Sequence, residues 1–136
     1  MIKKIIKDIL IFRKAEPATR SDLRTAVDLA DTLRANRDIC VGMAANMIGV
    51  QKRIIAFAAG PAVITMINPV IVKRSGGSYE AEEGCLSLDG TRKTVRYNEI
   101  EVEFCDLSFA KHRQTYSGFI AQIIQHEIDH CDGKVI

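Results

Sequence analysis

The sequence lacks two features that would point to a membrane or to nucleic acid. Its longest apolar runs, at residues 54–59 and 62–67, are far shorter than the roughly 20 residues that a membrane-spanning helix needs. The net charge is only +2, and no basic block is dense enough to follow a phosphate backbone. We therefore expect no membrane and no nucleic acid among the partners.

Signals for secretion are also missing. Lys7 and Asp8 interrupt the apolar stretch at the amino terminus, and no small-residue cleavage site follows it. No CxxC pair occurs, and the cysteine spacing is unlike that of a secreted disulfide scaffold. We expect a reducing, cytoplasmic location, in which a free thiolate can bind a metal. The four cysteines are Cys40, Cys85, Cys105 and Cys131.

The hydrophobic pattern predicts an α+β fold. Helical spacing indicates helices at residues 2–10 and 19–36, and a last helix that begins at Tyr116 or Ser117 and ends near Cys131. We expect mostly antiparallel β-strands packed around this C-terminal helix, with the other helices N-terminal, as a single domain over residues 1–136. The predicted strands are residues 54–58, 62–67, 70–73, 94–97 and 99–104, with turns at 75–78 and within 106–114.

Two of the three histidines lie four residues apart in QHEIDH, residues 125–130. On a helix, His126 and His130 project from one face, one turn apart, and can bind one divalent metal. Glu127, directly after the first histidine, can act on a water bound to that metal. The C-terminal helix is therefore the predicted metal-binding helix of a hydrolase.

A catalytic metal site of this kind needs a third protein ligand. His112 has two basic neighbours, and Cys131 points away from the histidine face of the helix. Cys105 has the pattern of a small buried side chain in a strand. Cys85 follows two glutamates and a glycine that permits a tight turn, so it is either the third ligand or another buried thiol.

The motifs around these residues resemble those of the peptide deformylases. Residues 83–87, EGCLS, and 125–130, QHEIDH, are similar to the second and third signature motifs of that family. Residues 42–45, GMAA, resemble the core of the first motif, Gly-x-Gly-x-Ala-Ala-x-Gln. The three stretches occur in the family's order, and the resemblance covers the chain from about Cys40 onward.

The resemblance implies an amide hydrolase that removes the formyl group from the amino-terminal formyl-methionine of nascent peptides. Cys85, His126 and His130 would bind the metal, which in this family is usually ferrous iron and often nickel or zinc. Glu127 would take a proton from the metal-bound water and pass it to the departing amine.

Further roles also follow from the resemblance. The Leu86 backbone N–H would donate to the developing oxyanion, and Gly42 would hold the substrate backbone in an extended pose. Glu83 would support the metal ligands, with Arg92 or Arg96 holding it in place.

The first motif departs from the family at two positions. Met47 stands where the family has a substrate-binding glutamine, whose amide is expected to donate to the formyl oxygen, and a thioether cannot donate. Cys40 stands where the motif begins with glycine, and its side chain would narrow the cleft or bring a thiol close to the metal. The alternative function is therefore a catalytically weak or inactive paralogue that binds metal and formyl-peptides.

The expected partners are N-formyl-methionyl peptides and, transiently, the ribosome. In some family members a helix beyond the metal-binding helix docks on the ribosome, and we expect that contact to be absent here, since the sequence ends at Ile136. A zincin-type peptidase shares the His126-Glu127-x-x-His130 pattern, but it needs another histidine or glutamate ligand downstream, and none follows.

Overall fold

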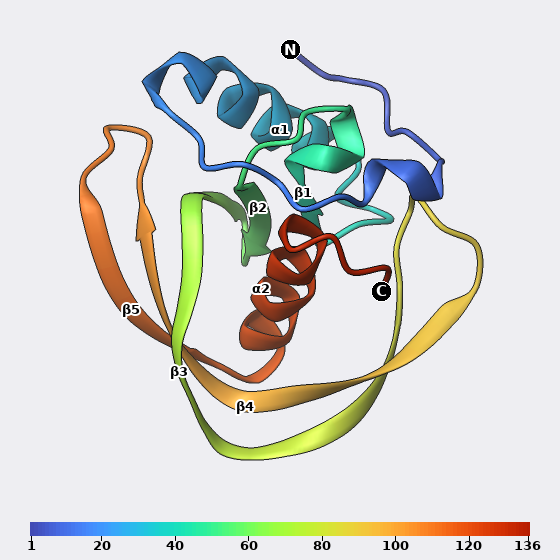
Figure 1. Ribbon diagram of the computed structural model, residues 1–136, viewed down its shortest axis with the longest axis vertical. Helices are drawn as coiled ribbons and strands as arrows, with labels where there is room; N and C mark the ends of the chain where they lie inside the picture. Colours follow the sequence, from blue (N-terminus) through green and yellow to red (C-terminus); the bar gives the residue numbers. More distant parts are fainter.

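The computed structural model describes residues 1–136, which form a five-stranded antiparallel sheet with two α-helices. The strands follow the order β1-β2-β3-β4-β5, so each strand pairs with its neighbours in the sequence. The fold is α+β, as predicted, and α2 lies at the centre of the molecule, with the curved β3 and β4 wrapped around it (Figure 1). The elements are α1 (Leu23–Ala35), β1 (Gly42–Ala44), β2 (Ile54–Ala59), β3 (Ala62–Gly84), β4 (Thr91–Cys105), β5 (Lys111–Ser117) and α2 (Gly118–Cys131), with 3-10 turns η1 (Ile9–Ile11), η2 (Arg20–Asp22) and η3 (Ala45–Ile48).

Strand β2 is buried on both faces, which explains its continuous apolar sequence. Ile55 and Phe57 belong to the core that α2 covers, whereas Ile54 and Ala56 belong to the core on the side of α1. Successive side chains of a strand point to opposite faces, so a strand between two helices has no polar face. In Figure 1, β1 and β2 lie between α1 and α2, and this layering fixes α2 against the sheet.

The predicted helix at residues 2–10 is wrong. The structure has only the short turn η1 in this region, where the Asp8 carboxylate accepts from the Leu10 N–H at 2.9 Å. Ile5 and Ile6 pack against the α1-side core from an irregular segment, and the Ile6 N–H donates to the Met47 carbonyl at 2.9 Å. Burial of these side chains satisfies the apolar pattern without a helix.

The predicted turn at residues 75–78 is also wrong, because β3 continues through it. Gly76 and Gly77 have positive φ values of 74° and 79°, and the ladder with β4 shifts register there. Positive φ values of this kind favour glycine, which has no Cβ. The glycines therefore make a β-bulge, which bends a long strand where the sequence pattern indicated a chain reversal.

Strand β5 was not predicted, since the sequence indicated only a turn before the last helix. The turn is confined to residues 106–110, and residues 111–117 form an exposed edge strand on β4. Its partners are polar: Arg113 pairs with Glu101 at 2.6 Å and with Glu103 at 3.2 Å. A solvated edge strand lacks the apolar alternation by which strands are recognised.

Helix α2 agrees with the prediction and ends where the chain crosses the amino-terminal segment. Gly133, with φ +83°, lies just past its end, and an added Cβ would meet the Lys14 nitrogen at 2.8 Å. Only glycine fits this close left-handed exit. None of the helices has the length and apolar character that crossing a membrane would require.

Candidate metal centre

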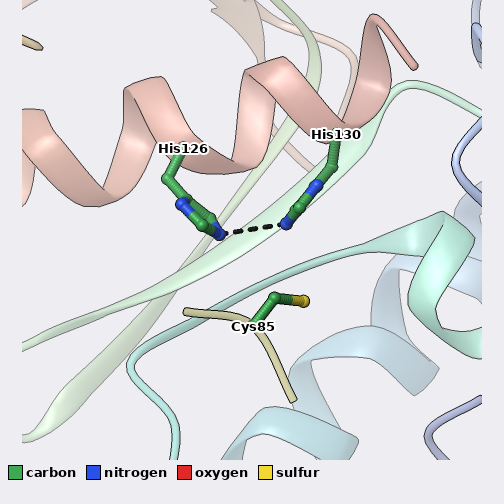
Figure 2. Close-up of side chains that lie close together, drawn as sticks. All are labelled: Cys85, His126 and His130. Carbon is green, nitrogen blue, oxygen red and sulfur yellow. Dashed lines mark hydrogen bonds between the residues drawn. The ribbon is translucent and has the colours of Figure 1, made fainter. Parts of the chain in front are cut away.

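His126 and His130 face each other on the buried side of α2. Their Nε2 atoms are 3.0 Å apart, and the residues are only 8% and 0% exposed. Cys85 approaches from the loop after β3, opposite the two rings (Figure 2). One ligand atom from each of the three residues lies within 4.8 Å of the other two. The structure thus brings together the three residues that were predicted to bind metal.

The other ring nitrogens are held by the protein. His126 Nδ1 lies 2.8 Å from a Glu83 carboxylate oxygen, and His130 Nδ1 lies 3.3 Å from the Lys134 carbonyl. Phe12 stacks on the His130 ring with 4.4 Å between ring centroids. Because these contacts fix the Nδ1 atoms, each ring presents Nε2 to the space that it shares with Cys85.

Glu83 is itself fixed by Arg96. The Arg96 Nη2 and Nε atoms donate to the carboxylate at 2.7 and 3.0 Å, and Gln122 Nε2 donates at 2.8 Å. Burial disfavours the charged carboxylate, but the hydrogen bonds from His126, Arg96 and Gln122 outweigh it and lower the pKa of Glu83 to about 2. Arg92 is opposite Glu83 in the β3–β4 ladder, yet its Nη1 has no hydrogen-bond partner. Of the two arginines considered, it is Arg96 that holds Glu83.

The pKa values of the two histidines shift in opposite directions. Burial acts against a charged His126, but contacts with Cys85 and Glu83 prevail and raise its pKa to about 10. Burial and the neighbouring His126 lower the pKa of His130 to about 3. A thiol and two imidazoles whose Nε2 atoms face each other are donors that suit zinc or iron, so the residues present fit a divalent metal.

Glu127 lies beside this centre and is buried. It is 4% exposed, its Oε1 has no hydrogen-bond partner, and burial raises its pKa to about 7. Gly42 of β1 allows this position, because an added Cβ would meet Ile123 Cγ2 at 2.6 Å and Glu127 Oε2 at 2.9 Å. An unpartnered carboxylate with this pKa is suited to exchange protons near neutral pH.

The centre opens into a cleft of about 430 Å³. Gly42, Met47 and Leu86, the residues predicted to contact substrate, all line it, together with Cys85, His126 and Glu127. The lining comes from three parts of the fold: β1 and the residues around it, the end of β3 with the loop after it, and α2. The remaining lining residues are Ile39, Cys40, Val41, Glu82, Glu83, Gly84, Gly90, Phe119, Gln122 and Ile123.

Two contacts at the site had no signal in the sequence. Asn46 Nδ2 donates to the His130 carbonyl at 2.8 Å and so ties η3 to the end of α2. The Cys40 thiol donates to the Gly42 carbonyl at 2.9 Å, and burial raises the pKa of Cys40 to about 12, so it keeps its proton. The first contact joins residues 84 apart in the sequence, whose relative placement only the folded chain defines, and the second is local, between residues two apart.

Comparison with known proteins agrees with this geometry. The family model described as "Polypeptide deformylase" matches residues 2–136. A peptide deformylase of Clostridium beijerinckii is 56% identical over all of both chains, and peptide deformylase 2 of Clostridium acetobutylicum is 34% identical over 96% of this chain and 88% of its own.

Solved structures agree as well. The class I type b peptide deformylase of Acinetobacter baumannii, in the structure with K1U bound, superimposes with a TM-score of 0.87 at 27% identity, covering 99% of this chain and 96% of that one. The peptide deformylase of Thermotoga maritima gives 0.87 at 26% identity, covering 99% and 95%. The chain therefore belongs to the peptide deformylase family, the metal-dependent hydrolases that remove the formyl group from amino-terminal formyl-methionine.

Proposed function

We propose that Cys85, His126 and His130 bind a divalent metal, ferrous iron first and nickel or zinc as substitutes, at the active site of this deformylase. The observation that carries the proposal is the pair of buried Nε2 atoms 3.0 Å apart, with the Cys85 donor atom within 4.8 Å of both. When bound, the metal supplies a Lewis acid that polarises the formyl carbonyl and lowers the pKa of the attacking water.

Glu127 moves the protons of the reaction. Its unpartnered Oε1 accepts a proton from the attacking water, which adds to the formyl carbon, and the same carboxyl then gives that proton to the departing amine. The C–N bond breaks, and formate and a free amino terminus leave. Because burial raises its pKa, the Glu127 carboxylate can act as a base before attack and, once protonated, as an acid after it.

Leu86 and Gly42 position the substrate. The Leu86 N–H donates to no backbone carbonyl of the chain, so it is free to donate to the formyl oxygen as negative charge develops on it. Gly42 lies on β1, at the edge of the sheet, where an extended peptide can add as a further strand. Met47 lines the same cleft but presents a thioether, which donates no hydrogen bond.

The substrates are N-formyl-methionyl peptides, and we place their hydrolysis in the cytoplasm, on chains leaving the ribosome. Apolar side chains of the cleft, among them Ile123 and Phe119, suit the methionine side chain. The second candidate function is that of a weak or inactive paralogue, and the specific observation in its favour is Met47 at the glutamine position.

Release of formate from formyl-Met-Ala-Ser tests this function. Protein prepared without oxygen and loaded with Fe²⁺, Ni²⁺ or Zn²⁺ should release formate far faster than the free ion, with acetyl-Met-Ala-Ser as the matched peptide that is not deformylated. A protein that binds one metal per chain but releases no formate with any of the three ions would favour the inactive paralogue.

A further inference from the structure

The Gly42 carbonyl points out of the sheet edge. Just before β1, the Val41 carbonyl points to β2, because it accepts from the Ala58 N–H at 2.8 Å. Gly42 follows Val41 and is the first residue of β1. Because backbone groups of successive residues point to opposite sides of a strand, Gly42 directs its N–H and C=O away from β2. β1 is the end strand, so no strand of this chain pairs with these groups.

The Gly42 carbonyl nevertheless already accepts a hydrogen bond within the chain. Cys40 lies two residues before it, lines the same cleft, and places its Sγ 2.9 Å from the Gly42 oxygen. A peptide that adds to the edge of β1 donates its own N–H groups to outward carbonyls of this kind. A carbonyl oxygen has two lone pairs, so the thiol and the peptide N–H would share this acceptor, and each would bind it more weakly than it would alone.

We propose that Cys40 is a specificity-determining residue of the cleft, whose thiol caps the Gly42 carbonyl and weakens the binding of extended peptide backbones. The proposal rests on the proposed function, since it concerns the same cleft and the same peptides. To bind with the full set of edge hydrogen bonds, a substrate must donate to an oxygen that already accepts from the Cys40 S–H, and sharing this acceptor weakens both hydrogen bonds.

Cys40→Ala and Cys40→Ser separate the hydrogen bond from the space that the side chain fills. Alanine and serine are close in size, but only serine can donate to the Gly42 carbonyl. A thiol is a weak donor, so we expect Cys40→Ala to lower KM for formyl-Met-Ala-Ser roughly two- to fivefold, with the change in KM rather than in kcat. Cys40→Ser should have a KM at or above that of the parent.

A peptide with one methylated nitrogen gives a second, independent comparison. The comparison uses a series of peptides, each methylated at a different peptide nitrogen. Methylation of the nitrogen that faces Gly42 removes the competing donor, so the peptide with that methyl group should bind the parent and Cys40→Ala equally well. If the alanine and serine variants had the same KM, or if every methylated peptide still distinguished alanine from the parent, the proposal would be overturned.

The binding of the product Met-Ala-Ser tests the role of Cys40 separately from catalysis, because the product binds without being hydrolysed. Calorimetry measures its affinity without turnover, and the S–H stretching band of Cys40, taken as the difference between parent and Cys40→Ala, should move to higher frequency when the peptide binds. An unchanged band in a complex with bound Met-Ala-Ser would refute the role of Cys40 even in an active enzyme. Absence of formate release by the parent would instead refute the proposed function.

Discussion

At the residue scale, the proposed role of Glu127 in proton transfer depends on its burial. Burial raises its pKa from 4.5 to about 7, and a cation held by Cys85, His126 and His130 would lower it again. The carboxylate must be ionised to accept a proton, so kcat/KM should fall as the pH decreases through this pKa. We expect the acidic limb of the pH profile of the metal-loaded enzyme to have its midpoint between about 4.5 and about 7. A midpoint below this interval would contradict the role of burial.

We expect the catalytic strength of this protein to depend on Met47. It is 1% exposed and lines the cleft, where the family is expected to have a glutamine that donates to the formyl oxygen. An oxyanion donor is typically worth ~100–1,000-fold in rate, so Met47→Gln should raise kcat by about 100-fold. Met47→Leu, which keeps an apolar side chain without a donor, should leave kcat within a few-fold of the parent. Equal rates for both variants would show that the missing donor does not limit the reaction.

The candidate site was largely predictable at the residue scale, because its motifs are short and local. The spacing of His126 and His130 depends only on helix geometry, and Cys85 lies in a five-residue motif. The choice of Arg96 over Arg92 as the partner of Glu83 was not predictable, because it depends on which side chain of β4 reaches across the ladder.

At the scale of elements, β1 packs closely against α2 at Gly42. Gly42→Ala would place a methyl group 2.6 Å from Ile123 Cγ2 and 2.9 Å from Glu127 Oε2, so α2 or Glu127 must shift. Overpacking of this kind typically costs ~1–3 kcal/mol, and we expect lower stability in urea unfolding together with a loss of kcat. Gly84→Ala, which also lies in the cleft lining, is the matched control, because its added Cβ meets nothing closer than 3.4 Å. Equal effects of the two variants would contradict a specific clash at Gly42.

The errors at this scale have physical causes in particular residues. Ile5 and Ile6 have helical spacing but are buried from an irregular segment, because the adjacent core can take them without a helix. Gly76 and Gly77 have turn composition but form a bulge, because β4 continues to pair on both sides of them. Local patterns report propensity, and pairing with distant residues overrides it. Helix α2 and strand β2 were predicted well because the apolar positions in their sequences are the positions that are buried in the fold.

At the scale of the whole molecule, the proposed metal ligands come from two parts of the chain that are distant in sequence. Cys85 follows β3, and His126 and His130 lie on α2. A metal that binds only the folded state stabilises it by ~2.7 kcal/mol at a free concentration of about 100 times its dissociation constant. A chelator should therefore lower the Tm of the loaded protein by roughly 10 °C, and returned metal should restore it. Cys85→Ala should weaken this response strongly, and a Tm that chelation leaves unchanged in the parent would contradict the site.

Parallel measurement of metal content and formate release in Glu127→Gln tests the central claim most directly. The claim is that Cys85, His126 and His130 hold the metal while Glu127, which is not a ligand, moves the protons. We predict that the variant binds one metal per chain as the parent does, and that its formate release from formyl-Met-Ala-Ser falls by about 100- to 10,000-fold. Full turnover with the metal bound would contradict the account.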